Sequence, residues 1–209
     1  MTVLDWLLDS DPAIRWQVLR DLAHAPAEVV AAERARVATE GWGARLLALQ
    51  DEDGQWAGGA CFPAPSNYQA DETEGQPWTS TLPTLQLLYD FGIDPRSDRV
   101  RRTVALVRDH CRWEHAGQPF FAGEVEPCIN GRTVTLGIYF GQAGHGPDSR
   151  MDEAMDLLRS KRQPDGISLL ENTHPGKVHF ALEDGDGRPS RWNTLRTLRV
   201  LRWYEESAT

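Results

Sequence analysis

The chain has 209 residues, enough for one domain with a sizeable core and short for two. Its 31 acidic residues against 22 basic ones give a net charge of -9, which argues against nucleic acid as the main partner. Three widely spaced cysteines, Cys61, Cys111 and Cys128, fit a reducing compartment better than a disulfide scaffold. We expect a single domain over residues 1–209 and, without a basic leader or a long apolar run, a soluble cytoplasmic protein with no membrane span.

Apolar residues recur at helical spacing through most of the chain, whereas strand patterns are weak. In the second of the predicted helices, Asp11 supplies an N-cap and Pro12 the first helical position. Long loops are expected over residues 51–76 and 114–127. The predicted helices cover residues 3–8, 13–23, 26–39, 41–50, 78–91, 97–113, 129–140, 148–163 and 190–206. This pattern predicts an all-α protein of stacked helical hairpins.

One short segment occurs twice, first as LLALQDEDGQW and later as LLRSKRQPDGIS. When Gly166 is aligned on Gly54, each copy shows a helix end, a Gln, an Asp-Gly turn and a loop. The second copy has Ser168 in place of Trp56, and its spacing from Gln to Gly is one residue shorter. Such repeats usually form units that must stack on their neighbours to bury an apolar face.

The first copy resembles the QW motif of squalene and oxidosqualene cyclases, with Gln50, Gly54 and Trp56 at the motif positions. These cyclases and the β subunits of protein prenyltransferases form the α/α-toroid superfamily. The resemblance implies an α/α toroid in which the Gln caps a helix end and the Trp stacks on it, so that neighbouring hairpins are tied together.

The length of the chain limits the size of such a ring. At repeats of roughly 40 to 50 residues, the chain supplies only about four or five hairpins. We therefore expect a small ring, an open ring, or one completed by a second subunit. An open ring exposes apolar surface, which favours a homo-oligomer or a hydrophobic ligand lying in the groove.

An acidic cluster, Glu183, Asp184 and Asp186, lies just before the last predicted helix. It resembles part of the D-x-D-D motif with which class II terpene cyclases protonate an alkene. The resemblance implies Asp184 and Asp186 as acid and electrostatic partner, with Glu183 beside them, because protonation requires clustered carboxylates shielded from water. The alternative is a solvated DGDG turn.

A second cluster partly resembles the zinc site of prenyltransferase β subunits. Glu126 and Cys128 match its D-x-C pair, but Asn193 occupies the position of its His ligand, for which His174 or His179 would have to substitute. The alternative is that Cys128 is a small buried residue and that Glu126 caps a helix. We therefore expect no cofactor, and zinc only under the third functional hypothesis.

Aromatic residues are the third candidate feature, because rings line the cavities of cyclases and stabilise carbocations through their π faces. The histidines His174 and His179 are candidates for an acid, a base or an anion contact. The expected ligand-binding residues are Trp78, Phe120, Phe121, Glu126, Cys128, Tyr139, His174, His179, Trp192 and Asn193.

These features lead to three functional hypotheses. The first is a squalene cyclase-like or prenyltransferase-like protein that binds a hydrophobic, isoprenoid-type ligand in a central cavity, with or without terpenoid cyclisation. The second is a non-catalytic helical-repeat scaffold for a protein partner. The third is a zinc-dependent prenyl transferase.

Overall fold

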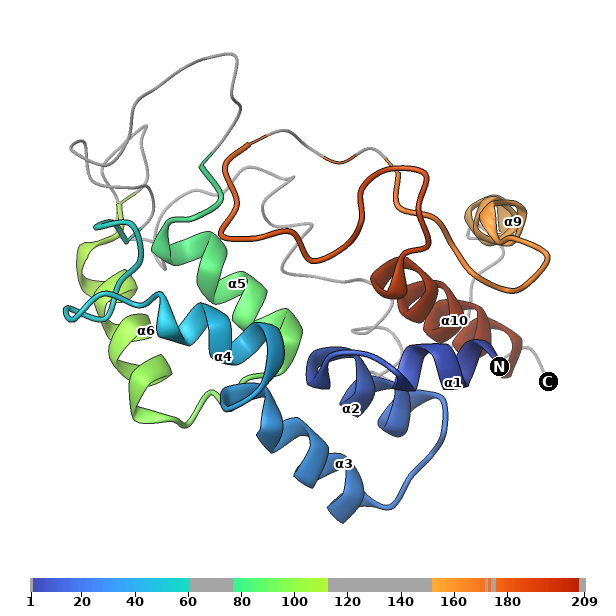
Figure 1. The fold of residues 1–209 in the computed structure, drawn as a ribbon, viewed down its shortest axis with the longest axis horizontal. Coiled ribbons are helices and arrows are strands. Elements are labelled where there is room, and N and C mark those ends of the chain that lie inside the picture. Colours follow the sequence, from blue (N-terminus) through green and yellow to red (C-terminus); the bar gives the residue numbers. More distant parts are fainter. Residues whose placement is uncertain (1, 61–76, 113–151, 172, 174–175, 207–209) are drawn as a thin grey trace.

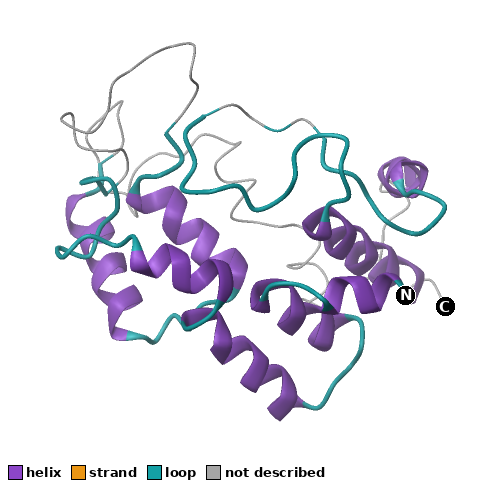
Figure 2. Cartoon of the chain, in the orientation of Figure 1, coloured by secondary structure: helices purple, strands orange, loops and turns teal. Residues whose placement is uncertain are grey.

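The computed structural model describes residues 2–60, 77–112, 152–171, 173 and 176–206 (Figure 1). Within these ranges the regular structure is helical, with isolated bridges and no strand (Figure 2). The helices are α1 (Val3–Leu8), α2 (Pro12–Asp21), α3 (Ala27–Ala35), the 3-10 helix η1 (Arg36–Ala38), α4 (Gly41–Ala48), α5 (Thr81–Phe91), α6 (Asp98–His110), α9 (Asp152–Lys161) and α10 (Arg191–Glu206). The all-α prediction is confirmed for the described residues.

The predicted helices agree with those observed, apart from their ends. The third predicted helix tightens into the 3-10 turn η1, and α5 begins at Thr81 rather than at Trp78. Pro83 lies in the first turn of α5, where a missing N–H removes no intrahelical hydrogen bond. The predicted helix over residues 129–140 and the loop over 114–127 lie outside the described residues.

Asp11 is the N-cap of α2, as predicted, and it also holds a second helix. Its Oδ1 accepts a hydrogen bond from the N–H of Ala13 at 2.9 Å, and its Oδ2 accepts one from the N–H of Trp42 at 2.7 Å. Trp42 lies in the first turn of α4. One half-buried carboxylate therefore fixes the starts of α2 and α4 against each other.

Helices that follow one another in the chain pack together in pairs. Helix α2 contacts α1, α3, α4, α5 and α10, while α5 also contacts α4 and α6. Figure 1 shows α4, α5 and α6 at one end and α1, α2 and α10 at the other. Helix α9 contacts α10, and residues 176–190 run over the start of α5 before they enter α10. The first and last helices of the described chain are thereby brought together around α2.

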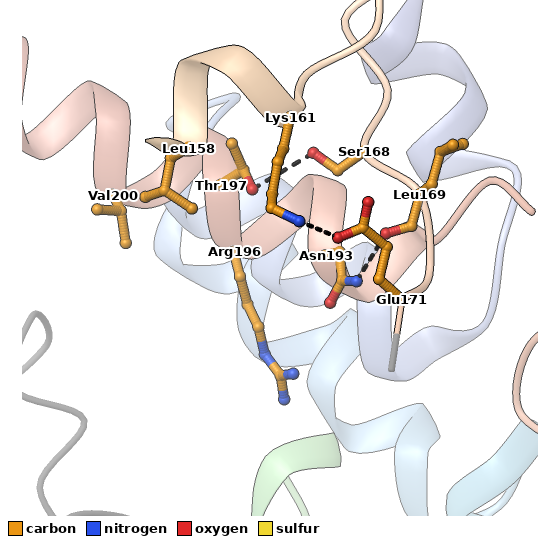
Figure 3. Close-up of a pocket in the computed structure, with 9 residues that line it drawn as sticks. All are labelled: Leu158, Lys161, Ser168, Leu169, Glu171, Asn193, Arg196, Thr197 and Val200. Carbon is orange, nitrogen blue, oxygen red and sulfur yellow. Dashed lines mark hydrogen bonds and ion pairs between the residues drawn. The ribbon is translucent and has the colours of Figure 1, made fainter. Parts of the chain in front are cut away.

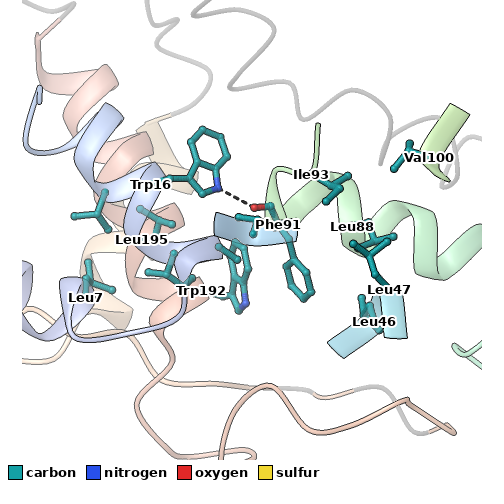
Figure 4. Packing of buried hydrophobic residues seen from close by; sticks show 14 of the residues in the cluster. Leu7, Trp16, Leu46, Leu47, Leu88, Phe91, Ile93, Val100, Trp192 and Leu195 are labelled. Carbon is teal, nitrogen blue, oxygen red and sulfur yellow. Dashed lines mark hydrogen bonds between the residues drawn. The ribbon is translucent and has the colours of Figure 1, made fainter. Parts of the chain in front are cut away.

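Three aromatic rings from distant parts of the chain form the centre of the core. Phe91 stacks on Trp192 with ring centroids 6.0 Å apart, and Trp42 lies 5.7 Å from Phe91 and 6.3 Å from Trp192. Next to them, the indole N–H of Trp16 donates to the carbonyl of Phe91 at 2.8 Å (Figure 4). The core therefore joins α2, α4, α5 and α10 and fills the space between them.

Gly92 permits this close packing at the end of α5. Its φ of 91° places it in the left-handed conformation that glycine adopts most easily at a helix C-terminus. A Cβ atom at this position would lie 2.5 Å from the ring of Trp16. A larger residue would therefore strain the backbone and also push Trp16 out of the core.

Arginines from other helices bind the carboxyl ends of four helices. Each guanidinium donates to main-chain carbonyls that have no partner inside their own helix. The pairs are Arg191 with Asp9 after α1, Arg202 with Asp21 and Leu22 at the end of α2, Arg99 with Leu47 in α4, and Arg34 with Gly92 after α5. These bonds connect the helices to one another and also place positive charge at the negative end of each helix dipole.

Cys111, which follows α6, is buried and disulfide-bonded. This differs from the expectation of reduced cysteines. The other two cysteines, Cys61 and Cys128, lie outside the described residues.

Candidate functional site

The first QW-like turn ties the end of α4 to the start of α5. The indole N–H of Trp56, whose side chain is 1 % exposed, donates to the carbonyl of Leu46 in α4 at 2.8 Å. The main-chain N–H of Trp56 donates to Oγ1 of Thr81, the first residue of α5, at 2.9 Å. The Trp of the motif, and not the Gln, therefore caps the helix end, which corrects the role that the resemblance implied.

Gln50 bridges the turn to α6. Its Nε2 donates to the carbonyl of Gly54 at 3.0 Å and to Oγ1 of Thr103 at 2.8 Å, while its Oε1 accepts from Arg99 at 2.9 Å. Thr103 Oγ1 donates in turn to the same Gly54 carbonyl at 2.8 Å. The side chain of Gln50 thus uses both its donor and its acceptor, which makes it a structural residue.

The second turn, between α9 and residues 167–171, repeats the backbone of the first. Asp51 N–H donates to the Gln55 carbonyl and Gly54 N–H to the Asp51 carbonyl, and the same two bonds recur from Gln163 to Ile167 and from Gly166 to Gln163. The two glycines have φ values of 93° and 87°. The N–H of Ser168 donates to Oγ1 of Thr194 in α10 at 2.9 Å, as Trp56 does to Thr81. The internal repeat is therefore real in three dimensions.

This match fixes the register of the repeat. Gln163 takes the place of Asp51, and the residue equivalent to Gln50 is Arg162, whose Nε donates to the Gly166 carbonyl at 3.1 Å. The interpretation of Gln163 as the second motif Gln is therefore wrong. The sequence carries a signal for this one-residue shift, because Gln163 lies one residue nearer to Gly166 than Gln50 does to Gly54.

The acidic cluster lies on the surface of the loop before α10. Glu183 is half-buried and accepts hydrogen bonds from the hydroxyl of Ser190 at 2.8 Å and from the N–H of Trp192 at 3.1 Å, so it caps the start of α10. Asp186 accepts from the N–H and hydroxyl of Thr173, and both Asp184 and Asp186 are exposed. The three carboxylates are neighbours in sequence, but only Glu183 points toward the protein interior.

Glu183, Trp192 and Asn193 border one hollow, which we call the α5–α10 hollow. It has a volume of about 170 Å³ and lies between α5, α10 and the loop before α10. Its apolar lining comes from Leu87, Leu170, Leu182 and Trp192, and its polar lining from Asp90, Glu183, Asn193 and Arg196. Three of the sequence-predicted site residues therefore meet at one place. The sequence gives no signal for the leucines as site residues, because Leu87 has only a helical apolar position in α5 and Leu170 and Leu182 lie in loops.

Two other predicted residues lie at the start of α5. Trp78 donates its N–H to the carbonyl of Lys177 at 2.9 Å, and Nε2 of His179 lies 2.9 Å from Oγ1 of Thr84. Burial lowers the pKa of His179, and the positive charge of Lys177 lowers it further. Both contacts hold residues 177–179 against α5, and neither residue lines the α5–α10 hollow.

The remaining predicted site residues lie outside the described residues: Phe120, Phe121, Glu126, Cys128, Tyr139 and His174. Asn193, in the position of the zinc-binding His, donates its amide to the carbonyl of Leu169 at 2.9 Å. No group of three or more His, Cys, Asp or Glu side chains among the described residues is arranged to hold a metal ion. The zinc hypothesis therefore has no set of ligands in this part of the chain.

Comparisons with known proteins found no matching family model, no matching curated protein and no matching solved structure. None of the helices in the described ranges is both long and apolar enough to cross a membrane.

Proposed function

We propose that this chain is an α/α-toroid-like protein that binds a hydrophobic, isoprenoid-type ligand, with the α5–α10 hollow as part of the binding site. The observation that carries the proposal is the meeting of Glu183, Trp192 and Asn193 around a hollow lined by leucines. The repeated turn supports the toroid likeness, because each copy ties the end of one helix to a later helix, α4 to α5 in the first copy and α9 to α10 in the second.

The lining of the hollow suits a branched hydrocarbon with a polar end. Leu87, Leu170 and Leu182 offer apolar surface, and the ring of Trp192 forms one wall. At the polar side, Arg196 lies 3.9 Å from Asp90, with its guanidinium carbon 5.2 Å from the centre of the Trp192 ring. Typical ligand pockets hold roughly 300–1,000 Å³. A hollow of 170 Å³ therefore takes one end of an isoprenoid chain rather than a whole polycyclic product.

The acidic cluster favours a hollow that binds the ligand over one that cyclises it by acid catalysis. Protonation of an alkene needs a neutral carboxylic acid shielded from water, and Asp184 and Asp186 are exposed. Glu183 borders the hollow, but both its oxygens accept hydrogen bonds from the first residues at the start of α10. We assign Glu183 to holding the start of α10, and an acid role for Asp184 and Asp186 stays a prediction.

A helical-repeat scaffold for a protein partner is the second candidate. The observation in its favour is that Trp42, Phe91 and Trp192 fill the space between α4, α5 and α10. The hollows found among the described residues are small, and a scaffold needs no central cavity. In that case the face formed by α5 and α10 binds a protein, or a second copy of this chain, instead of a small molecule.

Calorimetric titration with farnesol, below its aggregation concentration, tests the proposal. We expect saturable binding that weakens at least about tenfold in Leu182→Trp, because the indole ring is larger than the leucine side chain and fills the hollow. Leu49→Trp is the matched control, since Leu49 is 48 % exposed and lies away from the hollow. No saturable binding, or equal binding by the wild type and Leu182→Trp, would sink the ligand proposal.

A further inference from the structure

A second pocket lies where the second repeat lacks its tryptophan. It has a volume of about 220 Å³ and is lined by residues of α9, α10 and the turn between them: Leu158, Lys161, Ser168, Leu169, Glu171, Asn193, Arg196, Thr197 and Val200 (Figure 3). We call it the α9–α10 pocket. It is a different cavity from the α5–α10 hollow, although both touch Asn193 and Arg196.

The repeat register shows what this pocket corresponds to in the first unit. With Gly166 on Gly54, Ser168 is the equivalent of Trp56 and Leu158 is the equivalent of Leu46. In the first unit the Trp56 ring is buried and donates its N–H to the Leu46 carbonyl. In the second unit the two equivalent residues, Ser168 and Leu158, both line an open pocket. The pocket therefore occupies the place of the missing indole.

The size and chemistry of the pocket agree with this origin. Its volume corresponds to roughly seven liquid-water volumes, enough for a bicyclic aromatic ring. Leu158 and Val200 supply apolar walls. The Ser168 hydroxyl donates to Oγ1 of Thr197 at 3.4 Å, and Lys161 pairs with Glu171 at the rim (Figure 3). Ser168 thus keeps the main-chain hydrogen bonds that Trp56 makes in the first turn but has no ring to fill the space beside Leu158.

We propose that the α9–α10 pocket is a binding site for a planar aromatic ligand with a ring N–H, of the indole class. The ring lies where Trp56 lies in the first unit, between the turn and the flanking helices, and its N–H donates to the carbonyl of Leu158. This inference is independent of the proposed isoprenoid function, because it concerns another cavity and another ligand chemistry.

Titration of the full-length protein with indole, followed by two-dimensional NMR or calorimetry, tests the proposal. We expect saturable one-to-one binding with a Kd of about 1 mM or lower. Indene has the same shape but no N–H, and should bind roughly fivefold more weakly because one hydrogen bond is lost. Absence of saturable indole binding would overturn the site, and equal binding of indene would overturn the hydrogen bond to Leu158.

Ser168→Trp restores the motif and should fill the pocket from within. We expect this variant to lose indole binding at least about tenfold and to gain roughly 2–8 °C in Tm from the added buried ring. Ser160→Trp is the matched control, because Ser160 is exposed on α9 and does not line the pocket. Indole binding by Ser168→Trp equal to that of the wild type would contradict the proposal.

A second variant keeps the test decisive if Ser168→Trp fails to fold. Val200→Trp blocks the pocket from the α10 side and should also lose indole binding, while Val104→Trp, at a site 42 % exposed on α6, should retain it. Unchanged indole binding in Val200→Trp would overturn the assignment. The farnesol titration uses a different cavity and separate variants, so failure of one proposal does not imply failure of the other.

Discussion

At the scale of single residues, the most informative side chain is Asp11, which caps two helices with its two oxygens. By contrast, two other polar atoms in the described part of the protein, Oγ of Ser10 and Nε1 of Trp192, are buried without a hydrogen-bond partner there. Buried polar groups are usually paired, because desolvation without a hydrogen bond is costly. Asp11 is therefore the clearest point at which one residue determines how two elements meet.

Replacing Asp11 should test this role. We expect Asp11→Ala to lower the free energy of unfolding by about 1–3 kcal/mol, since two helix caps are lost. Asp11→Asn should cost less, because its amide keeps one acceptor oxygen for either Ala13 or Trp42. Urea denaturation followed by circular dichroism measures both values, with Asp184→Asn at an exposed site as the control, expected within ±0.5 kcal/mol. A loss below the control level in Asp11→Ala would contradict the double cap.

The pKa of Asp11 leads to a second prediction, which concerns how stability depends on pH. Burial raises the pKa of Asp11 above its ordinary value of 3.8, against the opposing effect of the Ala13 and Trp42 N–H donors. A raised pKa means that the folded protein holds the proton on Asp11 more tightly than the unfolded chain does. The protonated carboxyl therefore adds to the free energy of unfolding below pH 3.8, and this contribution is lost as the pH rises through the folded-state pKa. The stability of the wild type relative to Asp11→Asn should therefore fall from acid to neutral pH in urea denaturation. A relative stability that rises with pH would show that hydrogen bonding outweighs burial.

At the scale of elements, side-chain bonds across helices explain how the hairpins are joined. Helix ends leave carbonyls without partners, and here arginines and Trp56 from other elements supply the donors, while Gln50 binds the turn to α6. The sequence predicted the helices well, because apolar spacing and the Asp11–Pro12 start are local signals. It could not assign these cross-helix partners, because Arg99 and Gln50 are 49 residues apart.

The repeat register gives an element-scale prediction with a matched control. Gln50→Ala should lower the free energy of unfolding by about 1–2 kcal/mol, because it removes hydrogen bonds to Gly54, Thr103 and Arg99. Gln163→Ala should change it by less than about 0.5 kcal/mol, because Gln163 is exposed and stands at the position of Asp51 rather than Gln50. Chemical denaturation of the two variants compares them directly. Equal losses would restore Gln163 as the second motif Gln.

At the scale of the whole molecule, a hydrophobic cluster within the described part of the chain runs from α1 to α10. It includes Leu7 in α1, Leu46 in α4, Phe91 in α5 and Leu195 in α10 (Figure 4). The last helix is thus packed into the same core as the first. A core of this kind favours one cooperative unit among the described residues, and the single domain over residues 1–209 stays a prediction.

Leu195→Ala should reveal this cooperativity. Leu195 is fully buried, so we expect a loss of about 2–5 kcal/mol in the free energy of unfolding. Tryptophan fluorescence and circular dichroism should give one coincident transition in the variant and in the wild type. Two separate transitions, with only one displaced by the substitution, would show that α10 belongs to a different unit.

The candidate site was only partly predictable from the sequence. The sequence marks Glu183 through the acidic cluster, Asn193 through the position of the zinc-binding His, and Trp192 as an aromatic ligand-binding candidate, and the structure brings the three together. Leu87 and Leu170 could not be found in this way, because their places depend on contacts between distant segments. Helix α5, which carries Leu87, meets α10 through Phe91 and Trp192, and Leu170 is held by main-chain hydrogen bonds to residues 187 and 188. The same limit explains Asp184 and Asp186, since sequence clustering of carboxylates does not reveal whether they face the solvent.

Native mass spectrometry of the protein, before and after addition of farnesol, tests the central claim most directly. It records the number of subunits, any bound metal and any hydrophobic molecule that remains bound during purification. The ligand proposal predicts a one-to-one adduct per chain, either with an isoprenoid-type molecule from the host or with added farnesol, that is depleted in Leu182→Trp and kept in Leu49→Trp. A spectrum with no adduct under either condition would contradict it and favour the scaffold.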